Sequence, residues 1–268
     1  MSPSGSNDTH AAVPDRDFYQ TVIERLDAHR IPFLVGGAYA FHRHTGIERH
    51  TRDFDVFVLP EHGPLVLERL AADGYRTWMA FPHWLGKIGR DESYVDIIFS
   101  SGNGLGTVDA EWFEHSRPSQ VLGHDVRLCP IEEMIWQKAF IMERERFDGA
   151  DVLHLLRAGA ERMDWPRLLR RFGPHGRVLL AHLVLFGYVY PAERGRIPQT
   201  VFDRLLAGLD EPAPEDPHLS RGTLLSRSQY LSDLDRGLHD ARLAPVGPMC
   251  AQDIARWTAA ADEPPPRG

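Results

Sequence analysis

Cysteine is scarce in this 268-residue sequence, which contains only Cys129 and Cys250. The two cysteines lie far apart and form no Cys-x-x-Cys motif, so the sequence indicates neither a disulfide framework nor a zinc ribbon. No apolar run approaches the length of a membrane span, and residues 1–14 lack the apolar stretch of a secretory signal. These absences favour a cytoplasmic protein with no membrane contact.

An excess of positive charge is also lacking, because the formal net charge is −8 at pH 7. This balance argues against a surface dominated by non-specific nucleic-acid binding. One segment differs: six arginines lie between Arg157 and Arg177, against only Glu161 and Asp164. That segment either receives a polyanion or forms a solvated helix face.

Two carboxylates are predicted to lie side by side on one strand. The apolar stretch 33–35 runs into Gly36 and Gly37, a short helix follows, and the strand 51–58 then carries Asp53 and Asp55. Side chains alternate faces along a strand, so these two aspartates point the same way. Adjacent negative charges are costly unless a cation lies between them. The alternative is a solvated pair or a cap at a loop end.

A third carboxylate follows on another apolar strand, 93–99, as Asp96. If that strand lies beside the first, three carboxylates converge and can bind Mg²⁺ or Mn²⁺, which prefer hard oxygen ligands. Glycines let backbone N–H groups approach a ligand closely, and a helix start favours anions such as phosphates. Together these features indicate a metal-bound triphosphate.

These residues resemble the nucleotidyltransferases of the DNA polymerase beta superfamily, in the small bacterial branch that includes antibiotic nucleotidyltransferases and abortive-infection toxins. The resemblance covers about residues 30–100, and a weaker likeness continues from Ile131 to Asp151. It implies an α/β (α+β) fold, with a small mixed sheet and flanking helices in residues 15–129. An all-helical domain is expected in residues 130–258, with disordered tails at 1–14 and 259–268.

The resemblance also implies an activity and its residues. The enzyme would move a nucleoside monophosphate from an NTP, such as ATP, to an acceptor hydroxyl and release pyrophosphate, with Mg²⁺ or Mn²⁺ bound. The expected catalytic and metal-binding residues are Asp53, Asp55 and Asp96. The expected nucleotide-binding residues are Gly36, Gly37, Arg52, Lys87 and Lys138.

The acceptor and some of these roles stay open. The acidic net charge favours a small hydroxylated acceptor, the arginine-rich segment leaves room for tRNA as in toxin-like relatives, and a non-catalytic nucleotide-binding regulator is a third alternative. No obligate protein partner is expected. Lys87 either meets phosphate or lies in a solvated hairpin, and Lys138 either reaches the cleft or covers the packing with its stem. Asp148 and Asp151 either belong to the site or cap a helix.

Periodicity predicts the remaining elements. Apolar residues at helical spacing indicate helices over 15–29, 38–45, 63–72, 131–146, 151–158, 165–172, 178–190 and 199–209. Short apolar runs indicate strands over 31–35, 75–79 and 83–88, and a strand pair within 119–128.

Overall fold

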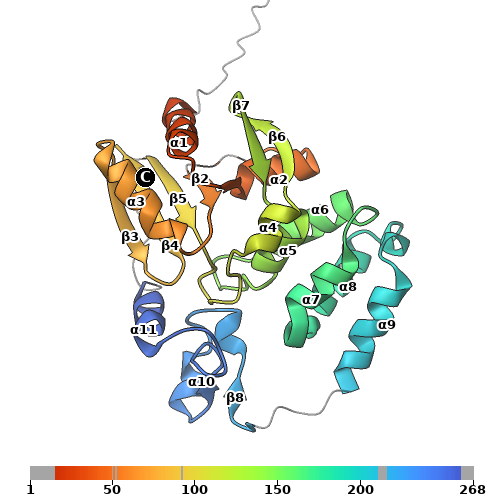
Figure 1. Cartoon of the computed structure of the whole chain (residues 1–268). Coiled ribbons are helices and arrows are strands. Elements are labelled where there is room, and N and C mark those ends of the chain that lie inside the picture. Colours follow the sequence, from red (N-terminus) through yellow and green to blue (C-terminus); the bar gives the residue numbers. More distant parts are fainter. Residues whose placement is uncertain (1–15, 50, 52, 92, 211–215, 261–268) are drawn as a thin grey trace, which may run out of the picture.

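The computed structural model describes residues 16–49, 51, 53–91, 93–210 and 216–260. Its centre is a mixed seven-stranded sheet in the order β3-β4-β5-β2-β1-β7-β6 (Figure 1), which confirms the predicted α/β fold. The strands are β1 (Leu34–Val35), β2 (Asp53–Phe57), β3 (Arg76–Phe81), β4 (Leu85–Arg90), β5 (Ser93–Ile98), β6 (Arg117–Val121) and β7 (His124–Leu128).

The middle of the sheet places β2 between β1 and β5. β2 runs antiparallel to β1 and parallel to β5, and Asp55 pairs in register with Asp96. Directly paired residues on neighbouring strands point to the same face of a sheet. The topology therefore brings residues 41 positions apart in sequence onto one patch of one face.

Two helices cover the opposite face of this part of the sheet. α1 (Arg16–Ala28) stacks Tyr19 on Phe54 of β2, with ring centroids 5.4 Å apart. α3 (His62–Ala72) lays Leu67 over Gly86, where an added Cβ would lie 2.8 Å from Leu67 Cδ1. The odd-numbered positions of β2, including Asp55, consequently point away from α1 and α3.

The face that carries the carboxylates is closed at one end by α4 (Ala110–Glu114). Trp112 of α4 stacks on Phe57 with ring centroids 5.4 Å apart. Phe57 lies two residues after Asp55 and on the same face of β2. Asp53 and Asp55 themselves keep partial contact with solvent.

The described residues after 130 form helices and one pair of two-residue strands. The elements are α5 (Ile131–Ala139), α6 (Gly149–Gly159), α7 (Trp165–Phe172), α8 (Gly176–Val189), α9 (Gln199–Ala207), β8 (Leu219–Ser220), α10 (Leu231–Asp235), β9 (His239–Asp240) and α11 (Ala251–Ala259). In Figure 1, α7, α8 and α9 form a layer beside the sheet domain, while α11 returns to the β3 strand. Trp257 of α11 packs edge-on against Phe81, with ring centroids 4.9 Å apart.

One predicted element is wrong at its end: the helix expected over 131–146 stops at Ala139. Phe140 is buried and stacks on Phe172 of α7, and beyond it the backbone is satisfied by other segments. The Met142 N–H donates to the Leu225 carbonyl over 3.0 Å, and the Asp148 N–H donates to the Ile141 carbonyl over 3.1 Å. The chain therefore turns back here instead of continuing as a helix.

The hydrophobic core is one continuous cluster of buried apolar side chains that extends from α1 to Ala241. The domain boundary expected between residues 129 and 130 stays a prediction. Residues 1–14 of the expected N-terminal tail, and 261–268 of the expected C-terminal tail, lie outside the described residues, whereas Ala259 ends α11. Among the described helices, none is both long and apolar enough to cross a membrane.

Candidate active site

Three carboxylates meet on the sheet face that α1 and α3 leave uncovered. Asp53 and Asp55 come from β2 and Asp96 from β5, and one oxygen of each lies within 4.8 Å of the others. The expectation that the third aspartate joins the first two is confirmed by this register. Side chains alternate between the two faces along each strand, and the two strands pair in register. The three aspartates therefore lie on the same face, next to one another.

The electrostatics of the cluster favour a cation. Burial, together with the negative charges of Asp53 and Asp96, raises the pKa of Asp55 to about 7. Burial and the charge of Asp53 also raise the pKa of Asp96, although the Lys87 ammonium opposes the shift. The chain's own cations thus leave the cluster short of positive charge. Three hard oxygen ligands in this state fit Mg²⁺ or Mn²⁺.

Gly36 and Gly37 form the turn that lies against β2. The Gly36 N–H donates to the Asp55 carbonyl over 3.0 Å, and an added Cβ on Gly36 would lie 2.2 Å from the Phe57 ring. Gly37 has φ +51°, and an added Cβ there would lie 1.6 Å from Asp55 Oδ2. Only residues without a side chain allow this approach of backbone to carboxylate.

The same turn begins α2 (Gly37–Thr45) at the cluster. The first N–H groups of a helix have no intrahelical partner and attract anions. Because the Gly36 N–H already binds the Asp55 carbonyl, the donors available to a ligand start at Gly37.

Lys87 lies at the cluster. It pairs in register with Asp96 on the neighbouring strand, and its Nζ is 2.6 Å from Asp96 Oδ1. Its ammonium also lies 5.5 Å from the centroid of the Tyr94 ring. The alternative of a solvated hairpin lysine therefore does not describe it. Lys87 and Lys138 are the only two lysines of the chain.

Lys138 belongs to a second charged group, which faces the carboxylates. Its Nζ lies 2.8 Å from Asp148 Oδ2 and 3.0 Å from Asp151 Oδ2. Arg146 binds both oxygens of Asp148, over 2.8 and 2.9 Å. Burial alone would raise the pKa of Asp148, but Arg146 and Lys138 outweigh it and lower the pKa to about 2.

This second group lies close enough to act on the first. The positive charges of Lys138 and Arg146 both lower the pKa of Asp55, against the larger effects that raise it. Asp148 stands at the N-cap position of α6 but makes no capping hydrogen bond there, so the capping alternative does not account for it. The sequence gives Arg146 no role beyond the weak likeness over residues 131–151, because its position depends on the turn after α5.

Three residues just before the Asp53 strand complete the immediate surroundings. Arg52, an expected nucleotide-binding residue, lies outside the described residues. The hydroxyl of Thr51, a residue that belongs to the family likeness before the carboxylates, donates a hydrogen bond to the Asp53 carboxylate. Arg49 pairs with Asp151 and so ties the segment before β2 to the start of α6.

An aromatic surface continues from the carboxylates along the same sheet face. Tyr94 pairs in register with Asp53, and Trp78 pairs with Lys87. The Trp78 and Tyr94 rings meet edge-on with centroids 5.7 Å apart, and the Arg76 guanidinium lies 4.9 Å from the Trp78 centroid. The alternation that locates Asp96 also locates Tyr94, two residues earlier, and was the available signal for this surface.

Three arginines of the arginine-rich segment pair with carboxylates. Arg167 is buried against Glu132 and Glu133, Arg171 binds Asp109, and Arg157 binds a glutamate of the following segment. These three side chains form neither an open basic surface nor a purely solvated face.

No protein-family model and no curated protein matches the sequence significantly. Several solved structures are similar in shape. A lincosamide antibiotic adenylyltransferase is 15% identical with a TM-score of 0.38, over 53% of this chain and 94% of its own. The antibiotic-resistance factor ANT(2'')-Ia is 17% identical with a TM-score of 0.38, over 74% and 95%. A putative nucleotidyltransferase from H. pylori is 14% identical with a TM-score of 0.40, over 76% and 100%. At these values the likenesses carry no argument about function.

Proposed function

We propose that this chain is a metal-dependent nucleotidyltransferase that uses an NTP, with ATP as the first candidate, and a small hydroxylated acceptor. One observation carries the proposal: three carboxylates from two parallel strands converge beneath a Gly-Gly turn that begins a helix. Such an arrangement offers a divalent-ion site and a phosphate-binding backbone next to each other.

The metal would be held by Asp53, Asp55 and Asp96. A divalent ion bound there supplies positive charge to the triphosphate and to the attacking oxygen. Thr51 orients the Asp53 carboxylate, and the backbone carbonyl of Asp55 fixes the Gly36 amide. Burial and the charges of Asp53 and Asp96 raise the pKa of Asp55, and a cation bound beside it would favour its ionised form.

The triphosphate would be received by backbone and lysine donors. Amides from Gly37 onward point from the start of α2, and Lys138 and Arg146 face the carboxylates from the other side. Both cations are held in place by Asp148. Pairing of this kind keeps long side chains ordered before the ligand arrives, which lowers the entropic cost of binding.

The transfer itself forms one bond and breaks another. The acceptor hydroxyl oxygen attacks the α-phosphorus, the bond from that phosphorus to the bridging oxygen breaks, and pyrophosphate leaves. Asp96, whose pKa is raised by burial, is our candidate to accept the hydroxyl proton. Positioning and charge neutralisation supply most of the catalysis in reactions of this type.

The acceptor is proposed to lie over the aromatic surface made by Trp78 and Tyr94. Both rings share the carboxylate face of the sheet, and a flat apolar surface flanked by polar groups suits the ring of a small molecule. A tRNA acceptor has less support, since Arg157, Arg167 and Arg171 are already paired with carboxylates.

The test is incubation of the protein with each radiolabelled NTP, Mg²⁺ and a small-molecule extract, with pyrophosphate release as the readout. The wild type is expected to transfer the label to a small molecule. The Asp55→Asn variant is expected not to catalyse this transfer. Wild-type rates in that variant would defeat the proposal. A Trp78→Ala variant should raise the KM of the acceptor and leave the KM of the NTP unchanged, which separates the two subsites.

A further inference from the structure

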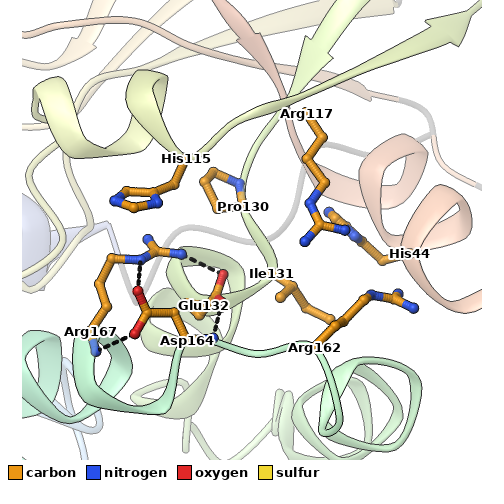
Figure 2. Close-up of a pocket in the computed structure, with 9 residues that line it drawn as sticks. All are labelled: His44, His115, Arg117, Pro130, Ile131, Glu132, Arg162, Asp164 and Arg167. Carbon is orange, nitrogen blue, oxygen red and sulfur yellow. Dashed lines mark hydrogen bonds and ion pairs between the residues drawn. The ribbon is translucent and has the colours of Figure 1, made fainter.

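A second charged cavity lies away from the carboxylates, at the other end of α2. It has a volume of about 110 Å³ and lies between the last turn of α2, the beginning of β6 and the start of α5 (Figure 2). Gly37 opens α2 at the carboxylates, and His44 in its last turn lines the cavity. Seven residues of helix separate the two by about 10 Å.

Two arginines without carboxylate partners line this cavity. Arg117 begins β6 and Arg162 lies in the turn between α6 and α7, and Figure 2 shows both side chains gathered around His44. Among the described residues neither guanidinium has a hydrogen bond or an ion pair. Burial first, and then the charges of Arg162 and Arg117, lower the pKa of His44. The two positive charges therefore act on the same small space.

The acidic residues of the cavity are already engaged with another arginine. Glu132 accepts a hydrogen bond from the Asp164 N–H over 2.8 Å and pairs with Arg167 over 2.6 Å. Asp164 in turn accepts from the Arg167 N–H over 3.0 Å. Glu132 and Asp164 carry two negative charges against the one on Arg167, so the three arginines that line the cavity exceed its carboxylates by one positive charge.

The third arginine of the cavity, Arg167, is held by carboxylates. It is 2% exposed, its Nη2 lies 2.6 Å from Glu132 Oε2, and its Nε lies 3.7 Å from Asp164 Oδ2 (Figure 2). The guanidinium groups of Arg117 and Arg162 are therefore the ones left for a ligand. Guanidinium groups prefer planar oxyanions and phosphates, which accept several hydrogen bonds at once.

We infer that this cavity is a binding site for a phosphate-type oxyanion, a free phosphate or the phosphate group of a small molecule. The ligand binds between Arg117 and Arg162 and neutralises both. It thereby links β6 and the turn between α6 and α7 to the last turn of α2, which carries His44. Since α2 also begins at the proposed catalytic turn, occupancy stabilises the helix on which that turn depends. The site is separate from the proposed transferase function and does not rest on it.

Isothermal titration calorimetry with inorganic phosphate, at ionic strength matched with sodium chloride, tests the site on the full chain. We expect saturable binding to the wild type that weakens about tenfold in Arg117→Gln and again in Arg162→Gln, since each substitution removes a charged hydrogen-bond donor to the phosphate. Arg204→Gln on α9 changes an exposed arginine outside the cavity and is the matched control.

The two sources of the ligand are separated by a second titration. Tighter binding of a phosphorylated sugar than of inorganic phosphate would assign the site to an organic phosphate, and equal binding would assign it to the free ion. Binding that is unchanged in the Arg117→Gln/Arg162→Gln double variant would overturn the inference. So would a wild type that ignores phosphate and binds only an RNA duplex through these arginines. Far-ultraviolet circular dichroism confirms that each variant is folded.

Discussion

Gly37 lies so close to Asp55 that a Cβ added to it would be 1.6 Å from the Asp55 Oδ2. Its φ of +51° is also one that side chains disfavour. The backbone of the turn therefore packs directly against the Asp55 carboxylate. A change at the glycine acts directly on the carboxylate.

Gly37→Ala should therefore lose activity without unfolding the protein. The new methyl group displaces the Asp55 carboxylate, and a misplacement of about 1 Å costs about a hundredfold in rate. The measurement is Mg²⁺-dependent pyrophosphate release. Gly46→Ala is the matched control, because Gly46 has φ +75° but no atom within 4 Å of an added Cβ. That variant should lose only about 1–2 kcal/mol of stability, and equal activity losses in both variants would contradict the prediction.

Asp55→Asn should stabilise the metal-free protein while it abolishes turnover. Burial and the neighbouring charges of Asp53 and Asp96 raise the pKa of Asp55 to about 7. Above that pH the carboxylate is ionised in the folded protein, and its charge destabilises the folded state. Removing the charge should raise the free energy of unfolding in EDTA at pH 8 by on the order of 1–3 kcal/mol. Added Mg²⁺ should then stabilise the wild type and not the variant.

Urea denaturation with and without Mg²⁺ measures both effects. Asp235→Asn on α10, where the aspartate is exposed, serves as the control and should behave as the wild type does. A variant at Asp55 that is less stable than the wild type in EDTA would show that the carboxylates are satisfied without a cation.

The convergence of the carboxylates was predictable from the sequence because its cause is local. Each of the three aspartates lies on an apolar strand, and the alternation of side chains along that strand determines the face to which the aspartate points. The sequence did not show that the two strands pair; the structure does. The Gly-Gly turn was predictable for the same reason, since glycine before a helix marks a backbone that must approach another group.

The surroundings of Lys138 were not predictable in this way. Apolar spacing continues to Met142, so periodicity extends the helix beyond its observed end at Ala139. The chain turns there because Phe140 packs on Phe172 and the Met142 N–H binds Leu225, a residue 83 positions away. Contacts between distant segments override local propensity at such points. Asp148 reaches Lys138 only as a result of that turn.

Arg167→Met should destabilise the fold strongly. Arg167 is 2% exposed and pairs with Glu132 and Glu133, of which Glu133 is fully buried. Removing Arg167 leaves the buried Glu132 without a counter-charge and Glu133 with Arg171 alone, 3.2 Å away. Loss of one partner from a buried pair typically costs about 3–5 kcal/mol. Arg170→Met on the same helix should cost less than about 1 kcal/mol. Arg170 is 58% exposed, and its ion pair with Glu111 is long, at 3.7 Å.

The free energy of unfolding in urea distinguishes the buried pair from packing alone. If the loss comes from the uncompensated carboxylates, adding Glu132→Gln and Glu133→Gln to Arg167→Met should recover part of the stability. No recovery in the triple variant would assign the loss to the volume and shape of the arginine.

His175 should make the stability of the helical half depend on pH. Burial, with a smaller contribution from the charge of Arg221, lowers its pKa to about 4, and its ring packs edge-on against Phe140 with centroids 5.5 Å apart. The unfolded chain binds a proton at about pH 6.5 while the folded chain does not until about pH 4. The stability contribution is therefore complete above pH 6.5 and is lost as the pH falls toward 4. Between pH 7 and 5 we expect a loss of about 2 kcal/mol or less, measured by urea denaturation. His175→Gln, which stays neutral throughout, should show a smaller loss than the wild type over the same range, and an equal loss in both proteins would place the pH dependence elsewhere.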